Sequence, residues 1–136
     1  MAEFVLGIDA GGTAVKAAVY SLDGRELGLT VRNCRPLTPA PGHVERDPLQ
    51  LWTDVAATVR AALAGAGLTG ADIAAVGITG YGNGIYLIDT AGEPVANGLT
   101  SSDTRAVDLV AAWRAAGLEA EEVRPLATGS PAVSIR

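Results

Sequence analysis

Residues 4–13 read Phe-Val-Leu-Gly-Ile-Asp-Ala-Gly-Gly-Thr, an apolar run that ends in a carboxylate and a glycine-rich turn. A second strand-like run, residues 14–22, follows at once and carries Lys16, the single lysine of the chain. Apolar residues on both faces of the first run indicate a buried strand. The sequence therefore predicts that the fold opens with two strands joined by a tight turn.

The turn combines groups that a metal–polyphosphate complex requires. Asp9 can hold a divalent cation through a carboxylate oxygen or a water molecule. Gly11 and Gly12 let backbone N–H groups approach phosphate oxygens. Thr13 adds a hydrogen-bond donor, and Lys16 adds a compact positive charge for a transferring phosphoryl group. Phosphoryl transfer from ATP with Mg²⁺ is the leading hypothesis, with Asp9 and Lys16 as catalytic candidates.

A plainer interpretation of this segment is a strand-to-strand turn that needs glycine for its dihedral angles and aspartate for a local hydrogen bond. Two other phosphate-binding motifs are excluded. The Walker motif requires Gly-Lys-Ser/Thr followed by a helix, and the Rossmann fingerprint also leads into a helix. Here a strand-like run follows the turn.

Composition limits the class of protein. The chain has 136 residues, 49% of them hydrophobic, which suits one domain or a piece of a larger one. The net charge of −5 argues against a nucleic-acid or anionic-membrane partner. No apolar run is long enough to span a bilayer, and no secretory signal opens the chain, so we expect a cytoplasmic protein. Cys34 is the only cysteine and is expected to be a buried residue at a strand end.

Periodicity and turn signals predict the order β-β-β-α-β, followed by a hairpin and a helix, in an α/β fold. The first three strands should form an antiparallel meander. Asp47 and Pro48 should begin the first helix, because Asp suits the N-cap and Pro the first helical position. The strands are expected at residues 4–9, 14–22, 27–31, 74–79 and 85–89, and the helices at 47–65 and 103–117.

Helical spacing predicts that Trp52 and Trp113 lie in the core. Glu119, Glu121 and Glu122 are expected to form a solvated helix face. Residues 127–136 show neither helical nor strand periodicity, so the chain is expected to stop within a domain whose remainder lies beyond it.

Two further segments have both a structural and a functional interpretation. Residues 80–84, Gly-Tyr-Gly-Asn-Gly, are a flexible turn, or a loop whose missing side chains leave room for a ligand bound by the Asn83 amide. Residues 101–105, Ser-Ser-Asp-Thr-Arg, are a sugar-binding set of hydrogen-bonding groups, or a helix N-terminus capped by Ser102 or Asp103 with Arg105 in solvent. His43 has no neighbouring partner for a metal site or a catalytic dyad.

Three segments together resemble the FGGY carbohydrate kinases, which have the RNase H-like, actin-like ATPase fold. Residues 4–20 resemble the family's phosphate-binding hairpin. Residues 42–48, Gly-His-Val-Glu-Arg-Asp-Pro, with Trp52 resemble the stretch before its first long helix. Residues 76–80, 97–99 and 103–105 resemble its sugar-contacting core. The resemblance runs from about residue 4 to residue 115, so residues 1–136 would be part of an N-terminal kinase domain.

The resemblance implies roles for matching residues. Asp9 would hold the Mg²⁺–ATP complex, while Gly11, Gly12, Thr13 and Lys16 would face the phosphates. The sugar would be contacted by Tyr81, Gly82, Asn83, Asp103 and Arg105.

The resemblance also bears on the substrate. Ser101 stands where glycerol kinases have a tryptophan, and the loop is most similar to the L-xylulose kinase branch, so the expected substrate is a pentulose or related polyol. A homodimer is one assembly that the resemblance allows for the full-length protein.

The family's general-base Asp and its second domain would lie beyond Arg136, so the chain alone is expected to be inactive. Two alternatives stay open: a truncated, inactive product, and a non-enzymatic actin-like module that binds nucleotide.

Overall fold

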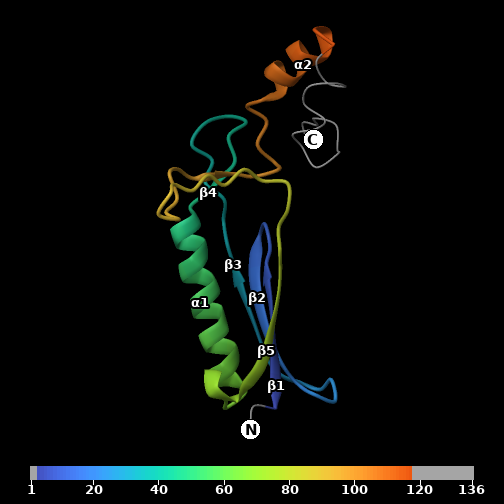
Figure 1. Cartoon of the computed structure of the whole chain (residues 1–136), viewed down its shortest axis with the longest axis vertical. Coiled ribbons are helices and arrows are strands. Elements are labelled where there is room, and N and C mark those ends of the chain that lie inside the picture. The colour runs from blue at the N-terminus through green and yellow to red at the C-terminus, as the bar shows by residue number, and fades with distance from the viewer. Residues whose placement is uncertain (1–2, 118–136) are drawn as a thin grey trace.

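A computed structural model describes residues 3–117, and its centre is a four-stranded mixed sheet in the order β3-β2-β1-β5 (Figure 1). Strands β1 (Phe4–Ala10), β2 (Ala14–Ser21) and β3 (Glu26–Asn33) form the expected antiparallel meander. Strand β5 (Ile73–Gly80) runs parallel to β1 on its other side. Because β1 lies between β2 and β5, its carboxyl end and the following turn lie at the middle of one edge of the sheet.

Helix α1 (Pro48–Gly65) covers one face of this sheet (Figure 1). It begins where the sequence predicts: the Asp47 carboxylate accepts hydrogen bonds from the N–H groups of Leu49 at 2.8 Å and Gln50 at 3.2 Å. Gly67, with φ of 69°, turns the chain after the helix. A 3-10 turn, η1 (Gly70–Asp72), then leads into β5.

The core lies between α1 and the sheet. Leu6, Ala17, Val19 and Ala62 are its buried centre. Gly28 on β3 allows close packing, since a Cβ there would lie 2.7 Å from the Ala62 carbonyl oxygen. Cys34, directly after β3, is buried, as expected. This packing positions the β1–β2 hairpin against α1.

The end of the molecule beyond the β1–β2 turn is built from loops and short pairings. Strands β4 (Glu45–Arg46) and β6 (Gly98–Leu99) form a two-stranded antiparallel ladder, and α2 (Val107–Ala115) lies beyond them (Figure 1). The strand expected at residues 85–89 forms only isolated bridges, Ile85 with Leu99 and Ile88 with Pro94. The second helix begins at Val107, four residues later than Asp103.

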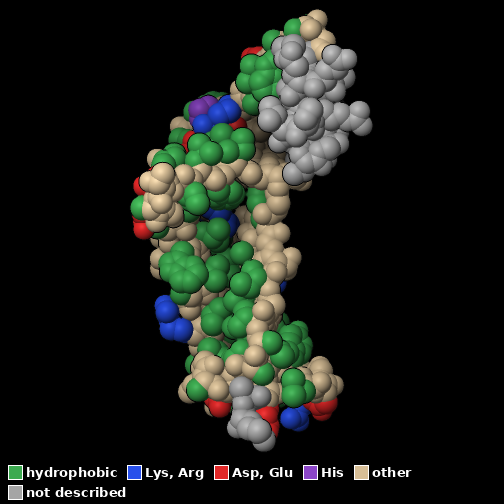
Figure 2. Space-filling view, viewed as in Figure 1, with side chains coloured by type: hydrophobic (Ala, Val, Ile, Leu, Met, Phe, Trp, Pro, Cys, Tyr) green, Lys and Arg blue, Asp and Glu red, His purple; other side chains and the backbone are tan. Residues whose placement is uncertain are grey.

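The two tryptophans differ from their expected burial. Trp52 is 71% exposed, so its assignment to the core was wrong, and Trp113 is half-buried. Trp52 lies beside an apolar groove of about 490 Å³ between α1 and the β1–β5 edge of the sheet. Hydrophobic side chains are exposed along this face (Figure 2). The helix is apolar around a wider arc than the four-stranded sheet covers.

The expectations for Glu119, Glu121, Glu122 and residues 127–136 lie outside the described residues. Neither α1 nor α2, the two α-helices within residues 3–117, has the length and hydropathy that crossing a bilayer requires.

Candidate functional site

The turn between β1 and β2 requires glycine for space rather than for a left-handed backbone. Neither Gly11 nor Gly12 has a positive φ. A Cβ on Gly11 would lie 2.8 Å from the Ala14 carbonyl oxygen. A Cβ on Gly12 would lie 3.0 Å and 3.1 Å from two ring carbons of Tyr81. The hairpin closes tightly at Gly11, and an aromatic ring packs directly on Gly12.

The carbonyl groups of this turn all have partners. The Ala10 oxygen accepts from the Tyr81 N–H at 3.0 Å, and the Thr13 oxygen accepts from the Cys34 N–H at 2.8 Å. The Arg46 guanidinium donates to the oxygens of Gly11 at 3.5 Å and Gly12 at 2.9 Å. The N–H groups of Gly12 and Thr13 have no acceptor within the part of the chain that the structure describes. The turn thus offers free donors and no free carbonyl, which suits an anion.

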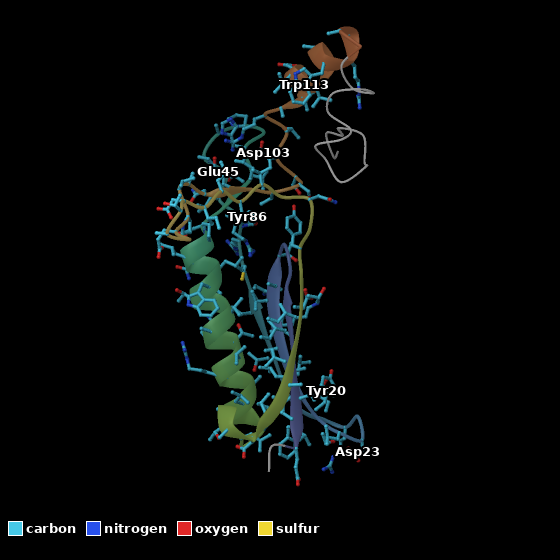
Figure 3. All side chains as sticks on the ribbon, viewed as in Figure 1. Tyr20, Asp23, Glu45, Tyr86, Asp103 and Trp113 are labelled. Carbon is cyan, nitrogen blue, oxygen red and sulfur yellow. The ribbon has the colours of Figure 1, made fainter. Side chains whose placement is uncertain are left out.

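A cavity of about 520 Å³ borders the turn on the α1 side of the sheet. It has the size of a small-molecule site. The residues around it come from β1 and the turn after it, β4, the start of α1, β5 and the loops near β6, and they include Gly11, Gly12, Thr13, Tyr81, Tyr86 and Thr100. The Tyr86 ring, labelled in Figure 3, packs against Gly98 so closely that an added Cβ there would overlap the ring.

Asp9 and Lys16 lie on the opposite face of the sheet from this cavity. They are paired across the hairpin, with Lys16 Nζ 3.5 Å from Asp9 Oδ2, and their side chains are 38% and 53% exposed. Side chains alternate along a strand, so Asp9 points away from the face on which Ile8 packs toward α1. The Asp9 carboxylate is beside the turn, since its oxygen lies 3.6 Å from the position of a Gly11 Cβ.

The donor set at Asp9 fits a magnesium ion carried by a nucleotide. Mg²⁺ is commonly bound by one or two carboxylates plus substrate phosphates and water. Residues 3–117 contain no group of three or more His, Cys, Asp or Glu that could form a closed metal site by themselves. Asp9 supplies one carboxylate beside the turn, so a magnesium ion there would need phosphate oxygens or water for its other ligands.

Tyr81 joins the turn to the loop before α2. Its hydroxyl accepts a hydrogen bond from the Ser101 N–H and is also bonded to Ser101 Oγ. Partial burial raises the pKa of Tyr81, but the hydrogen bonds from Ser101 outweigh it and the net pKa is lowered. Gly82 and Asn83 are exposed, and Asn83 has φ of 60°. Of the three expected sugar contacts in this loop, only Tyr81 lines the cavity.

Asp103 and Arg105 form an ion-pair network with Glu45. Arg105 Nη2 lies 2.7 Å from Glu45 Oε1 and 2.8 Å from Asp103 Oδ2, and the Val44 N–H donates to Asp103 Oδ2 at 2.7 Å. Hydrogen bonding from Arg105 lowers the pKa of Asp103 to about 2.

This network ties the segment before α2 to β4 and lies outside the cavity lining. The expectation of a helix cap at Ser102 or Asp103 was wrong: the N-cap is Ala106, without a side-chain bond.

Sequence reasoning missed Arg46 and Tyr86. Arg46 is 7% exposed and contacts the turn, yet it lies between two acidic residues, a pattern typical of a solvated segment. Only its place directly before the Asp47-Pro48 helix start could have suggested a fixed position.

The hairpin, the sheet order and the glycine turn define the N-terminal unit of the actin-like ATPase fold. Solved structures of sugar kinases share it. The ligand-bound xylulose kinase from Lactobacillus acidophilus matches with a TM-score of 0.78 at 20% identity, over 90% of this chain and 24% of that one. The xylulose kinase from Rhodospirillum rubrum matches with a TM-score of 0.70 at 27% identity, over 83% of this chain and 23% of that one.

The family model for the N-terminal domain of the FGGY family of carbohydrate kinases matches residues 4–134. The chain belongs to this family. It is 37% identical to the L-xylulose/3-keto-L-gulonate kinase of Escherichia coli (strain K12), over 100% of this chain and 28% of that protein. It is 42% identical to a glycerol kinase of Methylibium petroleiphilum, over 89% of this chain and 24% of that protein. The chain thus spans about a quarter of the length of these relatives.

Proposed function

We propose that this chain forms the phosphate-binding part, and one wall of the sugar site, of an ATP-dependent sugar kinase. The observation that carries the proposal is the β1–β2 turn. Its carbonyl groups are occupied, the N–H groups of Gly12 and Thr13 are free, and the Asp9–Lys16 pair lies beside it. Such a turn favours a polyphosphate with a divalent cation.

In the proposed reaction, a sugar hydroxyl attacks the γ-phosphorus of ATP, and ADP leaves. When bound, magnesium would neutralise phosphate charge, and Asp9 would hold it directly or through water. Lys16 and the two free N–H groups would balance charge on the phosphoryl oxygens. The hydroxyl's proton would pass to a carboxylate that the family resemblance places downstream of residue 136.

The proposed substrate class is a pentulose or related polyol. Relatives named as L-xylulose and xylulose kinases support it, although glycerol kinases are also among the relatives. Ser101 stands at the position where glycerol kinases have a tryptophan, and its side chain is hydrogen-bonded to Tyr81. The indole that flanks glycerol in those enzymes would therefore have no counterpart at this position. Tyr81, Thr100 and Ser102 would contribute hydroxyl groups to a sugar in the cavity.

The test requires a full-length chain that carries residues 1–136 and a coupled assay of ADP release. With Mg²⁺–ATP, pentuloses should stimulate ADP release, whereas the 136-residue chain alone should show none. Asp9→Ala should lower kcat by at least about 100-fold, because a charge-balancing contact of the transition state is lost. Asp23→Ala, in the exposed turn at the other end of β2, is the matched control.

An unchanged rate in Asp9→Ala would refute the metal role. The alternative of a regulatory nucleotide-binding module predicts a thermal shift with ATP but none with sugar.

A further inference from the structure

Arg46 is a buried cation that forms no ion pair with a carboxylate among residues 3–117. It is 7% exposed. A buried charge is costly unless hydrogen bonds compensate for its lost hydration. The Arg46 guanidinium donates to two backbone carbonyl oxygens, those of Gly11 at 3.5 Å and Gly12 at 2.9 Å. The fold thus places a costly charge against the candidate phosphate turn.

The backbone around Arg46 is fixed from both sides. Arg46 lies in β4 and pairs with Gly98 of β6. The next residue, Asp47, caps α1 through the N–H groups of Leu49 and Gln50. The guanidinium therefore projects from a short strand that is anchored to the first turn of the long helix.

Peptide geometry links these carbonyl bonds to the free donors of the turn. The carbonyl of one residue and the N–H of the next belong to one planar unit and point in opposite directions. When Arg46 holds the oxygens of Gly11 and Gly12, it also fixes the N–H groups of Gly12 and Thr13, directed away from the guanidinium. Neither of these N–H groups has an acceptor among the described residues.

The direction of these donors matches the position of the Asp9–Lys16 pair. Arg46 lines the cavity on the α1 side of the sheet, and Asp9 and Lys16 lie on the other face. Donors directed away from Arg46 therefore point toward the side that carries the carboxylate and the ammonium.

We propose that Arg46 is a positioning residue: it holds the Gly11 and Gly12 carbonyls so that the N–H groups of Gly12 and Thr13 are oriented for phosphate. This inference rests on the proposed kinase function. Arg46 would not touch the nucleotide and would act only through the turn. A lysine cannot reproduce the effect, because one ammonium does not present two donors in a fixed planar fork.

The experiment compares the full-length chain that carries residues 1–136 with its Arg46→Lys and Arg46→Gln variants. Initial rates are measured against ATP and, separately, against the sugar. Both variants should lose roughly 10- to 100-fold in kcat/KM for ATP, as for a lost oriented donor, while KM for the sugar stays within about twofold. Arg32→Gln, on the exposed outer strand β3, is the matched control and should leave both parameters unchanged.

Each outcome decides the inference. Equal kcat/KM for ATP in the wild type and Arg46→Lys would overturn it while leaving the kinase function intact. An equal rise of KM for ATP and of KM for the sugar, or unfolding of both variants, would make Arg46 merely structural and also overturn it. A wild type without ATP-dependent sugar phosphorylation would remove the proposed function, and the inference would fall with it.

Discussion

Replacing glycine by alanine at positions 11, 12 and 82 should give three different results within one site. The added methyl group meets backbone at Gly11, 2.8 Å from the Ala14 oxygen, and a side chain at Gly12, 3.0 Å from the Tyr81 ring. At Gly82 nothing lies within 4 Å of it. Since a hairpin backbone yields less easily than an aromatic ring, the cost should fall in the order 11, 12, 82.

The magnitudes follow from overpacking, which typically costs about 1–3 kcal/mol. Alanine also stabilises by reducing the freedom of the unfolded chain, by roughly 0.5 kcal/mol. We therefore expect a net loss of about 2 kcal/mol for Gly11→Ala and about 0.5–1 kcal/mol for Gly12→Ala. Gly82→Ala should be neutral or slightly stabilising, because only the entropic effect remains.

Urea unfolding of the three variants measures these differences directly. A double-mutant cycle adds a sharper test: Tyr81→Ala removes the ring, so Gly12→Ala should cost less in that background. Gly11→Ala should cost the same with or without the ring. Equal losses at positions 11 and 82, or no coupling between Gly12 and Tyr81, would refute the account of the turn.

Three further outcomes are expected. Asp103 contributes stability only while ionised; its folded pKa of about 2 is below the ordinary 3.8, so this contribution is complete above about pH 4 and is lost as the pH falls toward 2. Asp103→Asn should therefore reduce the free energy of unfolding at pH 7 by about 1 kcal/mol after solvent screening, with a weaker acid dependence in urea titrations. Trp52→Ser should change the free energy of unfolding by less than about 0.5 kcal/mol, because the indole is 71% exposed. A loss of several kcal/mol would show instead that Trp52 is part of the core. Tyr81→Phe should reduce the free energy of unfolding by about 1 kcal/mol, because the Ser101 N–H loses the hydroxyl that accepts its hydrogen bond. The same variant should raise KM for the sugar more than KM for ATP.

The hairpin and the long helix could be predicted from sequence because their signals are local. The apolar run before Asp9 and the glycine turn fix β1 and β2. The Asp47-Pro48 pair fixes the start of α1, where the carboxylate caps the helix as expected. Each of these elements carries its own start or stop signal within a few residues.

The loop end of the molecule could not be predicted because its structure depends on contacts between distant residues. Strands β4 and β6 are two residues each and lie about fifty positions apart, so neither shows a periodic pattern. Asp103 has the local signature of a helix cap, yet it bonds to Arg105 and to the Val44 N–H. Arg46 is buried only because the turn supplies acceptors for it.

In the proposed kinase, the β1–β2 turn binds polyphosphate through its free N–H groups. The most direct measurement is amide NMR of the full-length chain carrying residues 1–136, titrated with Mg²⁺–ATP. We predict large, saturable shifts at the amides of Gly12 and Thr13, and no shift at Gly24 in the turn at the opposite end of β2. Saturable ATP binding that leaves the Gly12 and Thr13 amides unchanged would contradict the claim.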